Sequence, residues 1–402
     1  MVDQSLVEQK RKREIDGLYY IAHLKNLPSI LRQGILSHQQ ILDRSLTFEP
    51  IYNADIVSNR RLKQTPDRRS LWEYANLYFE PRNAMLYKVV NYGAERALEN
   101  TVLLKVKASA LEIPDAWIAN GNAASVETEI IKISRTRLEA IAKQIDREYW
   151  SREDGSLRKM MAELLVPDMV PAEYIECIYV AKQEIKDRVS QSLQSELFLQ
   201  AIPIIVDPYR FFQPNALIRL NPRISLAKGD MFFSRLQTLT ISVNTKGVMG
   251  KGLASRAKWQ FPDVFIRYQQ LCQKKTLQIG KPAIVKRESS IGEELAQLAE
   301  DTGESTWFLL FPTKADWREN SKIEYIRSGM QWLLGNYKSS GIRSLAMPAL
   351  GCGLGGLSWA EVGPIMCSYA DKMNITACIY LPNEETVPEE HLRPEFLLRE
   401  IP

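Results

Sequence analysis

Histidine and cysteine are scarce in this chain of 402 residues, and their scarcity narrows the chemistry that it can perform. The 5 cysteines are odd in number, scattered and without CxxC spacing, so the sequence predicts neither a disulfide framework nor a structural zinc site. With 3 histidines, a catalytic triad or a histidine-rich metal site has few residues to draw on. We therefore expect carboxylate, arginine and lysine chemistry, without a metal.

Long apolar runs are also missing. No segment reaches the roughly eighteen uninterrupted apolar residues that a membrane span needs, and charges stand where a signal peptide has its apolar core in the first residues, MVDQSLVEQKRKREID. These absences predict a cytoplasmic protein without a membrane partner. The net charge of +4 does not by itself indicate a nucleic-acid partner. A local basic run between residues 60 and 69 is either a solvated face or a contact for a phosphate backbone.

Length and patterning predict two domains, residues 1–190 and 222–402, joined by a linker at 191–221. The linker is expected where a polar Ser/Gln stretch is followed by several prolines. From residue 222 to 385, apolar strands alternate with helical stretches, which is typical of a parallel sheet. The expected strands are Leu239–Val243, Trp307–Phe311, Ile342–Met347 and Ile375–Leu381, the expected helices are Leu253–Gln260, Ile323–Leu334 and Trp359–Lys372, and residues 286–305 are expected to form a surface excursion.

The first half has a less regular pattern. Residues 36–76 are predicted to form a long functional loop with a short helix near Asp55–Arg61. A helix over Leu27–Arg32 is expected to end at Gly34. The remaining expectations are strands at Leu18–Ala22, Val102–Val106 and Cys177–Ala181, and a helical run over Ile131–Tyr149 followed by Leu157–Leu165.

Two glycine-rich loops in the second half each follow a predicted strand. The first begins at Asn244, NTKGVMGKGL, and the second begins at Pro348, PALGCGLGGLSW. Glycine adopts positive φ and lacks the Cβ that would block a ligand, and the exposed N–H groups of such turns bind anions. A single loop is weak evidence because turns use glycine routinely. The pair predicts a clamp for a diphosphate.

The segment ISLAKGDMF at 224–232, together with these loops, resembles the macrodomain, a fold that binds ADP-ribose. The resemblance implies a three-layer α/β/α domain in which Asp230 holds the adenine amino group. It assigns the distal ribose to the first loop and the diphosphate to the second, with Lys251 as a phosphate neighbour. The implied ADP-ribose-binding residues are Asp230, Asn244, Gly250, Lys251, Gly252, Gly351, Cys352, Gly353, Leu354 and Gly355.

The first half resembles the DarT family over about residues 15–185. The matching segments, in family order, are LYYIAHLKNL at 18–27, ILRQGIL at 30–36, IVSNRR at 56–61, YFEPRNAMLY at 78–87 and MAELLVP at 161–167. DarT enzymes transfer ADP-ribose from NAD to bases of single-stranded DNA. The resemblance therefore implies an α+β ADP-ribosyltransferase-like domain, with NAD as co-substrate and single-stranded DNA as partner.

The resemblance assigns catalysis to Glu163 and to Arg60 or Arg61. Cleavage of the nicotinamide–ribose bond develops positive charge on the ribose, which a carboxylate stabilises. Glu163 is also expected to help remove a proton from the attacking base. Arg60 or Arg61 is expected to hold an NAD phosphate or to assist proton transfer, and the sequence does not separate the two. The residues implied in NAD binding are His23, Asn26, Tyr78 and Met85.

Several features of the first half leave alternatives open. Glu127-Thr128-Glu129 mimics the ExE motif of arginine-modifying transferases but lacks the rest of that pattern. Some DarT relatives carry a histidine in the region of residues 119–125, where this chain has none, so the target base, thymine or guanine, stays open. Asn122 is either a reader of a base edge or an ordinary turn residue. Trp72 and Tyr74 are either stacking platforms for unpaired bases or core residues.

The segment FPTKADWR at 311–318 resembles the DarG family, the antitoxin to DarT, and Lys314 is its implied nucleophile. Burial in a pocket would lower the lysine pKa and allow a Schiff-base intermediate on the opened ribose. The second loop has Gly355-Gly356 where related deglycosylating macrodomains have an aspartate, which leaves Lys314 without an evident acid partner.

The combined prediction is a toxin–antitoxin fusion, in which the first domain modifies single-stranded DNA and the second removes ADP-ribose from ADP-ribosylated DNA. Two alternatives stay open. The macrodomain would only bind ADP-ribosylated sites and recruit or restrain the transferase, or the pair would act as a sensor of NAD or ADP-ribose.

Overall fold

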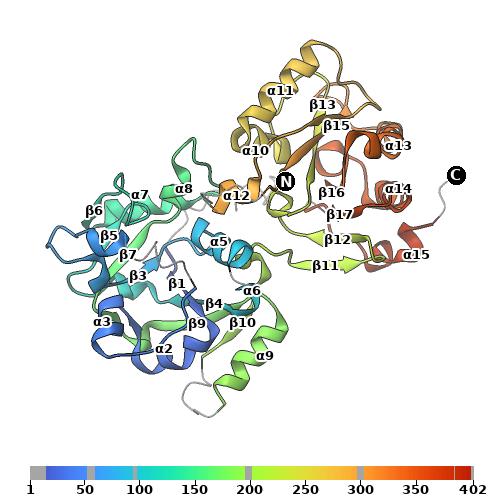
Figure 1. The fold of residues 1–402 in the computed structure, drawn as a ribbon. Coiled ribbons are helices and arrows are strands. Elements are labelled where there is room, and N and C mark those ends of the chain that lie inside the picture. Colours follow the sequence, from blue (N-terminus) through green and yellow to red (C-terminus); the bar gives the residue numbers. More distant parts are fainter. Residues whose placement is uncertain are drawn as a thin grey trace, which may run out of the picture. The chain divides into compact units, whose positions relative to one another are not determined.

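The computed structural model describes residues 15–51, 59–93, 97–194, 202–296, 303–383 and 385–399. The chain forms two compact units, Met1–Phe212 with Leu295–Gln297, and Gln213–Glu294 with Leu298–Pro402 (Figure 1). The division falls within the stretch expected as a linker. The described part of that stretch contains β10 (Ile204–Val206) and β11 (Ala216–Arg219), and each is paired into the sheet of its own unit.

The first unit is built on an eight-stranded sheet in the order β10-β9-β4-β1-β3-β7-β5-β6. All neighbouring pairs are antiparallel except the parallel pair of β10 and β9. The central strands are buried along almost their whole length, so the sheet is covered on both faces there. The strand bounds are β1 (Leu18–His23), β3 (Tyr74–Tyr78), β4 (Thr101–Val106), β5 (Trp117–Ala119), β6 (Ile130–Lys132), β7 (Glu163–Pro167) and β9 (Ile175–Val180), with β2 (Ile35–Leu36) and β8 (Met169–Val170) forming a separate pair.

The helices of the first unit confirm some expectations and correct others. Gly34 ends the first helix as expected, with a φ of +88° and its N–H donated to the Ile30 carbonyl. The run expected over 131–149 is shorter, because its first residues join β6 and Ser134 caps the N-terminus of the observed helix. Residues 157–165 divide between a short helix and β7, so Glu163 opens a strand. The helices are α2 (Leu27–Gln33), α3 (His38–Asp43), α5 (Ala84–Tyr92), α6 (Ala97–Asn100), α7 (Arg135–Ile145), α8 (Ser156–Lys159) and α9 (Gln183–Ser192).

The short helix expected near 55–61 is seen in part. Residues 59–62 are helical, and residues 55–58 lie outside the described residues.

The second unit is a seven-stranded sheet in the order β11-β12-β17-β16-β13-β15-β14. Its five inner strands run parallel and the two edge strands run antiparallel to their neighbours. The bounds are β12 (Ile224–Lys228), β13 (Thr238–Asn244), β14 (Ala283–Val285), β15 (Trp307–Lys314), β16 (Ser344–Pro348) and β17 (Thr376–Tyr380), with helices α10 (Gly252–Gln260), α11 (Pro262–Gln273), α13 (Ile323–Ser340), α14 (Trp359–Lys372) and α15 (Pro394–Leu397). Helix α12 (Ile291–Ala296) begins in this unit, and its last two residues, Leu295 and Ala296, are assigned to the first unit.

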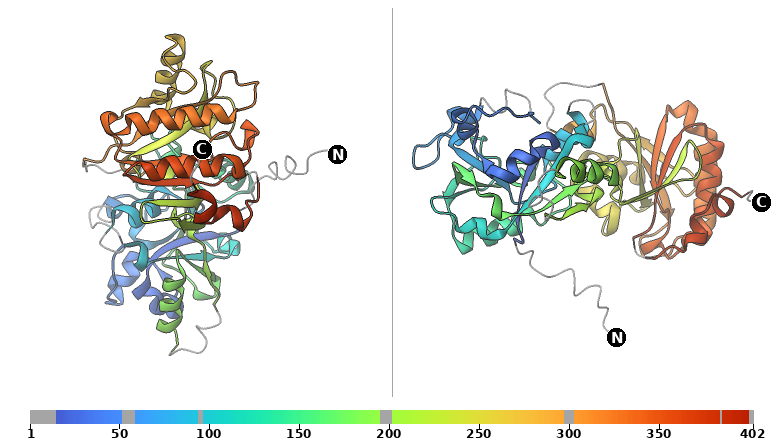
Figure 2. Two further views of the ribbon diagram at one scale, coloured as in Figure 1. Left: turned by 90° about the vertical axis from the view of Figure 1, so that its right-hand side faces the viewer. Right: turned by 90° about the horizontal axis from the view of Figure 1, so that it is seen from below.

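Helices cover both faces of this second sheet, which confirms the expected three layers. α13 and α14 lie side by side on one face, and α10 and α11 lie on the other (Figures 1 and 2). Buried residues of α13 and α14 pack against β12, β15, β16 and β17 on their face. On the other face, Phe261 contacts Phe232 and Phe308 with ring centroids 5.3 and 4.8 Å apart. The parallel order brings the carboxyl ends of β13, β15 and β16 to one edge of the sheet, where both glycine-rich loops begin.

Two expectations for the second unit need correction. Helix α11 has no counterpart among the expected helices, although Pro262 stands in its first turn, a position to which proline is well suited. Residues 286–305 are not purely a surface excursion, since α12 lies within them and Ile291 is buried. The expected strands and the helix over Trp359–Lys372 are confirmed.

Candidate active sites

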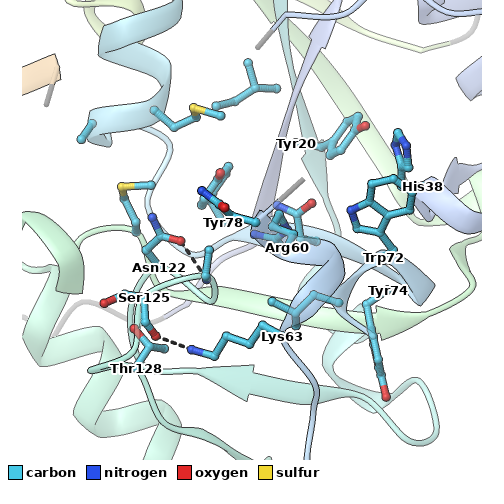
Figure 3. A pocket seen from close by; sticks show the side chains of 18 of the residues that line it. Tyr20, His38, Arg60, Lys63, Trp72, Tyr74, Tyr78, Asn122, Ser125 and Thr128 are labelled. Carbon is cyan, nitrogen blue, oxygen red and sulfur yellow. Dashed lines mark hydrogen bonds between the residues drawn. The ribbon is translucent and has the colours of Figure 1, made fainter. Parts of the chain in front are cut away.

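A cavity of about 970 Å³ lies in the first unit (Figure 3). Separate segments of the chain line it: β1 through Tyr20, the helical residues 59–62 through Arg60, β3 through Tyr78, and α5 through Met85. Its volume is at the upper end of the range for small-molecule sites. The cavity is therefore large enough for a dinucleotide-sized ligand.

The carboxylate of Glu163 is completely buried at the start of β7 and is held by two donors. Arg60 Nη1 lies 3.0 Å from Oε2 and 3.3 Å from Oε1, and the Ala123 N–H donates to Oε1 over 2.9 Å. Tyr78 stands opposite Glu163 in the pairing of β3 with β7. A carboxylate out of water needs such partners. Because Arg60 lines the cavity and Glu163 does not, the arginine stands between the carboxylate and the open space.

The structure separates the two arginines that the sequence left equivalent. Arg60 pairs with Glu163, and its second terminal nitrogen, Nη2, is buried without a hydrogen-bond partner among the described residues. Arg61 instead places its guanidinium 5.1 Å from the centre of the Trp72 ring. Arg60 is thus the arginine at the candidate catalytic carboxylate, with one donor nitrogen left for a ligand.

The loop that supplies the Ala123 N–H is fixed from two sides. Lys63 donates from Nζ to the Ser125 carbonyl, and burial lowers the pKa of this lysine while the charge of Glu163 opposes the shift. On the other side, the Asn122 N–H donates to the Arg158 carbonyl over 3.1 Å. No sequence pattern indicates the Ala123 donor, because a backbone N–H is available at every residue except proline.

The four residues expected to contact NAD fall into two groups. Tyr78 and Met85 line the cavity, and burial raises the pKa of Tyr78. His23 and Asn26 are not among its lining residues. His23 Nδ1 accepts a hydrogen bond from the Lys25 N–H over 3.2 Å. The Asn26 amide makes two hydrogen bonds of 2.8 Å with the backbone of Glu49.

The ExE mimic lies outside this arrangement, whereas the candidate stacking residues lie within it. Glu127 and Glu129 are exposed, and neither lines the cavity. Trp72 and Tyr74 both line it, and so does His38, whose ring centre lies 4.1 Å from that of Trp72. His38 was not predicted from the sequence, because no motif surrounds it.

In the second unit, Asp230 follows β12 and its carboxylate is held on both sides. Oδ1 accepts the Phe232 N–H over 3.0 Å, and Arg256 Nη1 on α10 donates to Oδ2 over 2.6 Å. The side chains of Asp230 and Arg256 are 11% and 13% exposed. Arg256 was not expected from the sequence, because only the tertiary fold brings the first turns of α10 to the end of β12.

Asn244 ends β13 and uses its side chain to shape the first loop. Its Oδ1 accepts the Lys246 N–H over 2.9 Å and the Tyr268 hydroxyl over 3.0 Å, and its Nδ2 donates to the Val248 carbonyl over 2.6 Å. Asn244 therefore folds the loop from inside. Gly250, Lys251 and Gly252 follow at the start of α10, where Lys251 is exposed.

The second loop presents backbone donors to a ligand. The N–H groups of Gly355 and Gly356 donate to carbonyls within the loop over 3.3 and 3.0 Å. Those of Gly351, Gly353 and Leu354 enter no hydrogen bond in the described parts of the chain. Free N–H groups that converge in a turn form a concavity for an anion.

Ser321 lies directly beneath this loop. Its N–H donates to the Gly355 carbonyl over 2.9 Å, and its hydroxyl is buried without a hydrogen-bond partner in the described structure. A Cβ at position 355 would lie 2.6 Å from Ser321 Oγ, so the close approach requires glycine there. Ser321 was not predicted from the sequence, because an isolated serine before a helix carries no motif.

Lys314 is the last residue of β15 and joins the two loops. Its Nζ donates to the Leu354 carbonyl over 2.6 Å, and burial lowers its pKa with no charged group contributing to the shift. Thr245 in the first loop donates to the Ala315 carbonyl over 2.8 Å. A Cβ at Gly252 would lie 3.4 Å from a methyl carbon of Leu354. The lysine therefore stands where both glycine-rich loops meet.

Comparison with known proteins identifies the family. A DNA ADP-ribosyl transferase-DNA ADP-ribosyl glycohydrolase fusion protein of Thermosipho africanus is 50% identical over 385 residues, which cover 95% of this chain and 98% of that relative. The chain belongs to the DarT–DarG fusion family. The structure of Thermosipho africanus DarTG in complex with ADP-ribose matches with a TM-score of 0.89 and 49% identity, over 95% of this chain and 100% of that one.

The two halves of the fusion are also matched separately. Residues 19–212 fit the family model of DarT, the ssDNA thymidine ADP-ribosyltransferase, and residues 242–366 fit the macro domain. A DNA ADP-ribosyl glycohydrolase of Thermus aquaticus is 35% identical over 139 residues, 35% of each protein. The first unit of this DarT–DarG fusion thus ADP-ribosylates single-stranded DNA, and the second reverses the modification. The expected family, fold and pair of activities are confirmed.

The comparisons decide between the alternatives that the sequence left open for the macrodomain, since they place it with DNA glycohydrolases. In the described ranges no helix has the length and apolar character to cross a membrane. No group of three metal-binding side chains occurs in those ranges either.

Proposed function

We propose that the first unit uses NAD as the ADP-ribose donor and thymidine in single-stranded DNA as the acceptor. The description of the matching family model supports thymidine. The observation that carries the proposal is the fully buried Glu163 held by Arg60 behind a cavity of about 970 Å³. A pre-oriented carboxylate beside a large cavity is suited to a substrate that develops positive charge as it reacts.

Glu163 stabilises the ribose in the proposed transfer step. As the bond between ribose and nicotinamide breaks, nicotinamide leaves with the electron pair and the ribose gains oxocarbenium character. A nitrogen of the base attacks the anomeric carbon and loses its proton to Glu163. Arg60 covers the carboxylate in this structure, so we propose that its guanidinium turns toward the substrate when NAD binds. The unpartnered Nη2 then donates to a phosphate.

The other NAD-contacting residues follow from the cavity. Tyr78 and Met85 are proposed to contact the nicotinamide end, because both line the cavity beside Arg60. His23 is proposed to contact the ribose or amide on the nicotinamide side, and Asn26 is proposed to contact NAD as well. This assignment is supported by β1, whose Tyr20 and Ile21 line the cavity just before His23 in the chain.

Lys314 is the proposed nucleophile of the reverse activity. The second loop would hold the diphosphate through the N–H groups of Gly351, Gly353 and Leu354, with Cys352 and Gly355 completing the turn, and Asp230 would hold the adenine. The ring bond between C1′ and O4′ breaks and O4′ takes a proton, while the neutral amine bonds to the anomeric carbon. The base then leaves with a proton, and water hydrolyses the resulting imine to release ADP-ribose and free the lysine. The lowered pKa of Lys314 supports this role, because only the neutral amine is nucleophilic.

The two activities make the chain a toxin and its antidote in one polypeptide. Single-stranded oligonucleotides incubated with NAD and the full chain are analysed by mass spectrometry. With Lys314→Ala we expect an ADP-ribose adduct that accumulates on thymidine, and with Lys314→Ala plus Glu163→Ala we expect none. The matched control is Lys338→Ala, at an exposed lysine on α13, which should behave like the wild type.

The outcomes of this experiment are separable. Adducts on guanine alone would show that thymidine is not the acceptor, and the role proposed for Glu163 would still stand. Adducts that accumulate equally with wild type and Lys314→Ala would remove Lys314 from the reverse reaction. An adduct that persists with Glu163→Ala would show that this carboxylate is not needed.

A further inference from the structure

Three exposed apolar side chains lie on the segments that meet at Lys314 in the second unit. Val248 of the first loop, Leu354 of the second loop and Trp317 after β15 are 41%, 60% and 49% exposed. Hydrogen bonds described above tie the three segments together around Lys314, from Thr245 to the Ala315 carbonyl and from Lys314 to the Leu354 carbonyl. The three residues therefore lie on segments that are joined at Lys314, and we call their side chains the rim below.

Trp317 occupies a fixed position in this rim. It lies on a turn closed by Asp316, whose Oδ1 accepts the Arg318 N–H over 3.0 Å and whose carbonyl accepts the Glu319 N–H over 3.2 Å. The Arg318 guanidinium lies 4.5 Å from the centre of the Trp317 ring. An ordered, half-exposed indole with an arginine on it offers both an apolar surface and a positive charge.

The substrate of the second unit has a part that free ADP-ribose lacks. In ADP-ribosylated DNA the modified base is attached at the anomeric carbon, which is the atom that Lys314 attacks in the proposed mechanism. The base must therefore lie next to Lys314, beside the residues proposed to hold adenine and the diphosphate. Unpaired bases are held by stacking on aromatic rings, and DNA phosphates by nearby cations. Trp317 of the rim meets the first requirement, and Arg318, whose guanidinium lies over the Trp317 ring, meets the second.

We propose that Trp317 stacks on the modified nucleobase of ADP-ribosylated single-stranded DNA and holds it while Lys314 attacks. Leu354 closes the opposite side of the base, since its carbonyl is bonded to Lys314 and its side chain is exposed. The specificity of the glycohydrolase for a base-linked ADP-ribose then resides in the rim, whereas the two glycine-rich loops bind the ADP-ribose that all substrates share. This inference rests on the proposed role of Lys314.

Trp317→Ala is compared with Trp259→Ala in the full-length chain, using three probes. Trp259 on α10 is the matched control, because it is 64% exposed and has Lys258 Nζ 4.7 Å from its ring centre but lies outside the rim. The probes are an ADP-ribosylated thymidine oligonucleotide, ADP-ribosyl thymidine as the free nucleoside, and ADP-ribose itself. Turnover is measured with the oligonucleotide and with the nucleoside, and binding of ADP-ribose is measured by calorimetry. Every variant also carries Glu163→Ala, which removes the transferase activity.

Stacking of one base predicts that Trp317→Ala raises KM by about 5- to 150-fold on both the oligonucleotide and the nucleoside. Affinity for ADP-ribose should stay within about twofold of the Trp259→Ala control. Trp317→Phe should recover most of the loss, since phenylalanine keeps an aromatic face.

Three results would overturn the proposal. An unchanged KM on both substrates would show that the base does not stack on Trp317. A loss on the oligonucleotide alone would place a neighbouring base on the ring. An equal loss of ADP-ribose affinity would mean that Trp317 supports the fold. The role of Lys314 is tested separately, because Lys314→Ala should abolish turnover while ADP-ribose and the modified oligonucleotide still bind.

Discussion

Replacement of Arg60 by methionine should destabilise the first unit and abolish DNA modification. The substitution leaves Glu163 fully buried with the Ala123 N–H as its remaining described donor. Removal of one partner from a buried ion pair costs about 3–5 kcal/mol. Because the Arg60 side chain is 15% exposed, water can partly replace it, and we expect the lower end, about 3 kcal/mol.

The same loss can be expressed as a shift in melting temperature. For a unit of this size each 1 kcal/mol corresponds to about 2–4 °C, so Arg60→Met should lower its Tm by about 6–12 °C. Calorimetry of the full chain measures this, provided that each transition is assigned to a unit. Leu333→Ala provides the assignment, since Leu333 is fully buried in α13 and its truncation should lower only the transition of the second unit.

Two further variants test whether the loss of the buried ion pair causes the drop in stability. Arg61→Met is the matched neighbour, and it should cost less than about 1 kcal/mol, because it removes a contact with an aromatic ring and no buried partner. Arg60→Met combined with Glu163→Gln should regain most of the lost stability, since it removes both charges, yet remain inactive. If Arg60→Met melts like the wild type, or if the double variant is no more stable than the single one, the buried pair does not have the energetic role assigned to it.

Three other predictions concern the second unit. Because burial lowers the pKa of Lys314 from the ordinary value of about 10.4, single-turnover removal of ADP-ribose should rise with pH as the amine loses its proton and level off below that value; a flat profile would contradict it. Gly355→Ala should weaken ADP-ribose binding by about 5- to 150-fold through overlap with Ser321, and Ser321→Gly in the same chain should restore it in calorimetry. Asp230→Asn should lower ADP-ribose affinity by about 1.5–3 kcal/mol, because it weakens the bond from Arg256 and the proposed contact to adenine; binding of ribose 5-phosphate, which lacks adenine, should not change.

Local patterns in the sequence determined much of the fold. The strand at Leu239–Val243 was predictable because apolar residues alternate with polar ones there, and the strand at Ile342–Met347 because mostly apolar residues lead into a glycine-rich turn. The two glycine-rich loops were predictable because their function depends on backbone shape, which glycine reveals directly. The helix expected over Ile131–Tyr149 was placed wrongly at its start, where the chain forms strand β6. A short apolar run there is compatible with a strand as well as with a helix.

The residues that contact one another across the chain were decided by the tertiary structure. Arg60 and Glu163 are 103 residues apart, and no local pattern distinguishes Arg60 from Arg61. The orientation of the helical residues 59–62 against β7 makes that choice. The Ala123 donor is likewise set by where the loop lies, since its N–H is chemically the same as any other.

The second unit shows the same division. The sequence alone determined that a lysine ends a strand near a glycine-rich loop, because Lys314 and the loops each lie at the end of an apolar run. That Lys314 bonds the Leu354 carbonyl, and that Ser321 lies under Gly355, depend on the packing of β15, α13 and the second loop. Short-range sequence patterns encode elements and flexible turns, whereas burial and pairing arise from contacts between distant segments, which exist only once the sheet has formed.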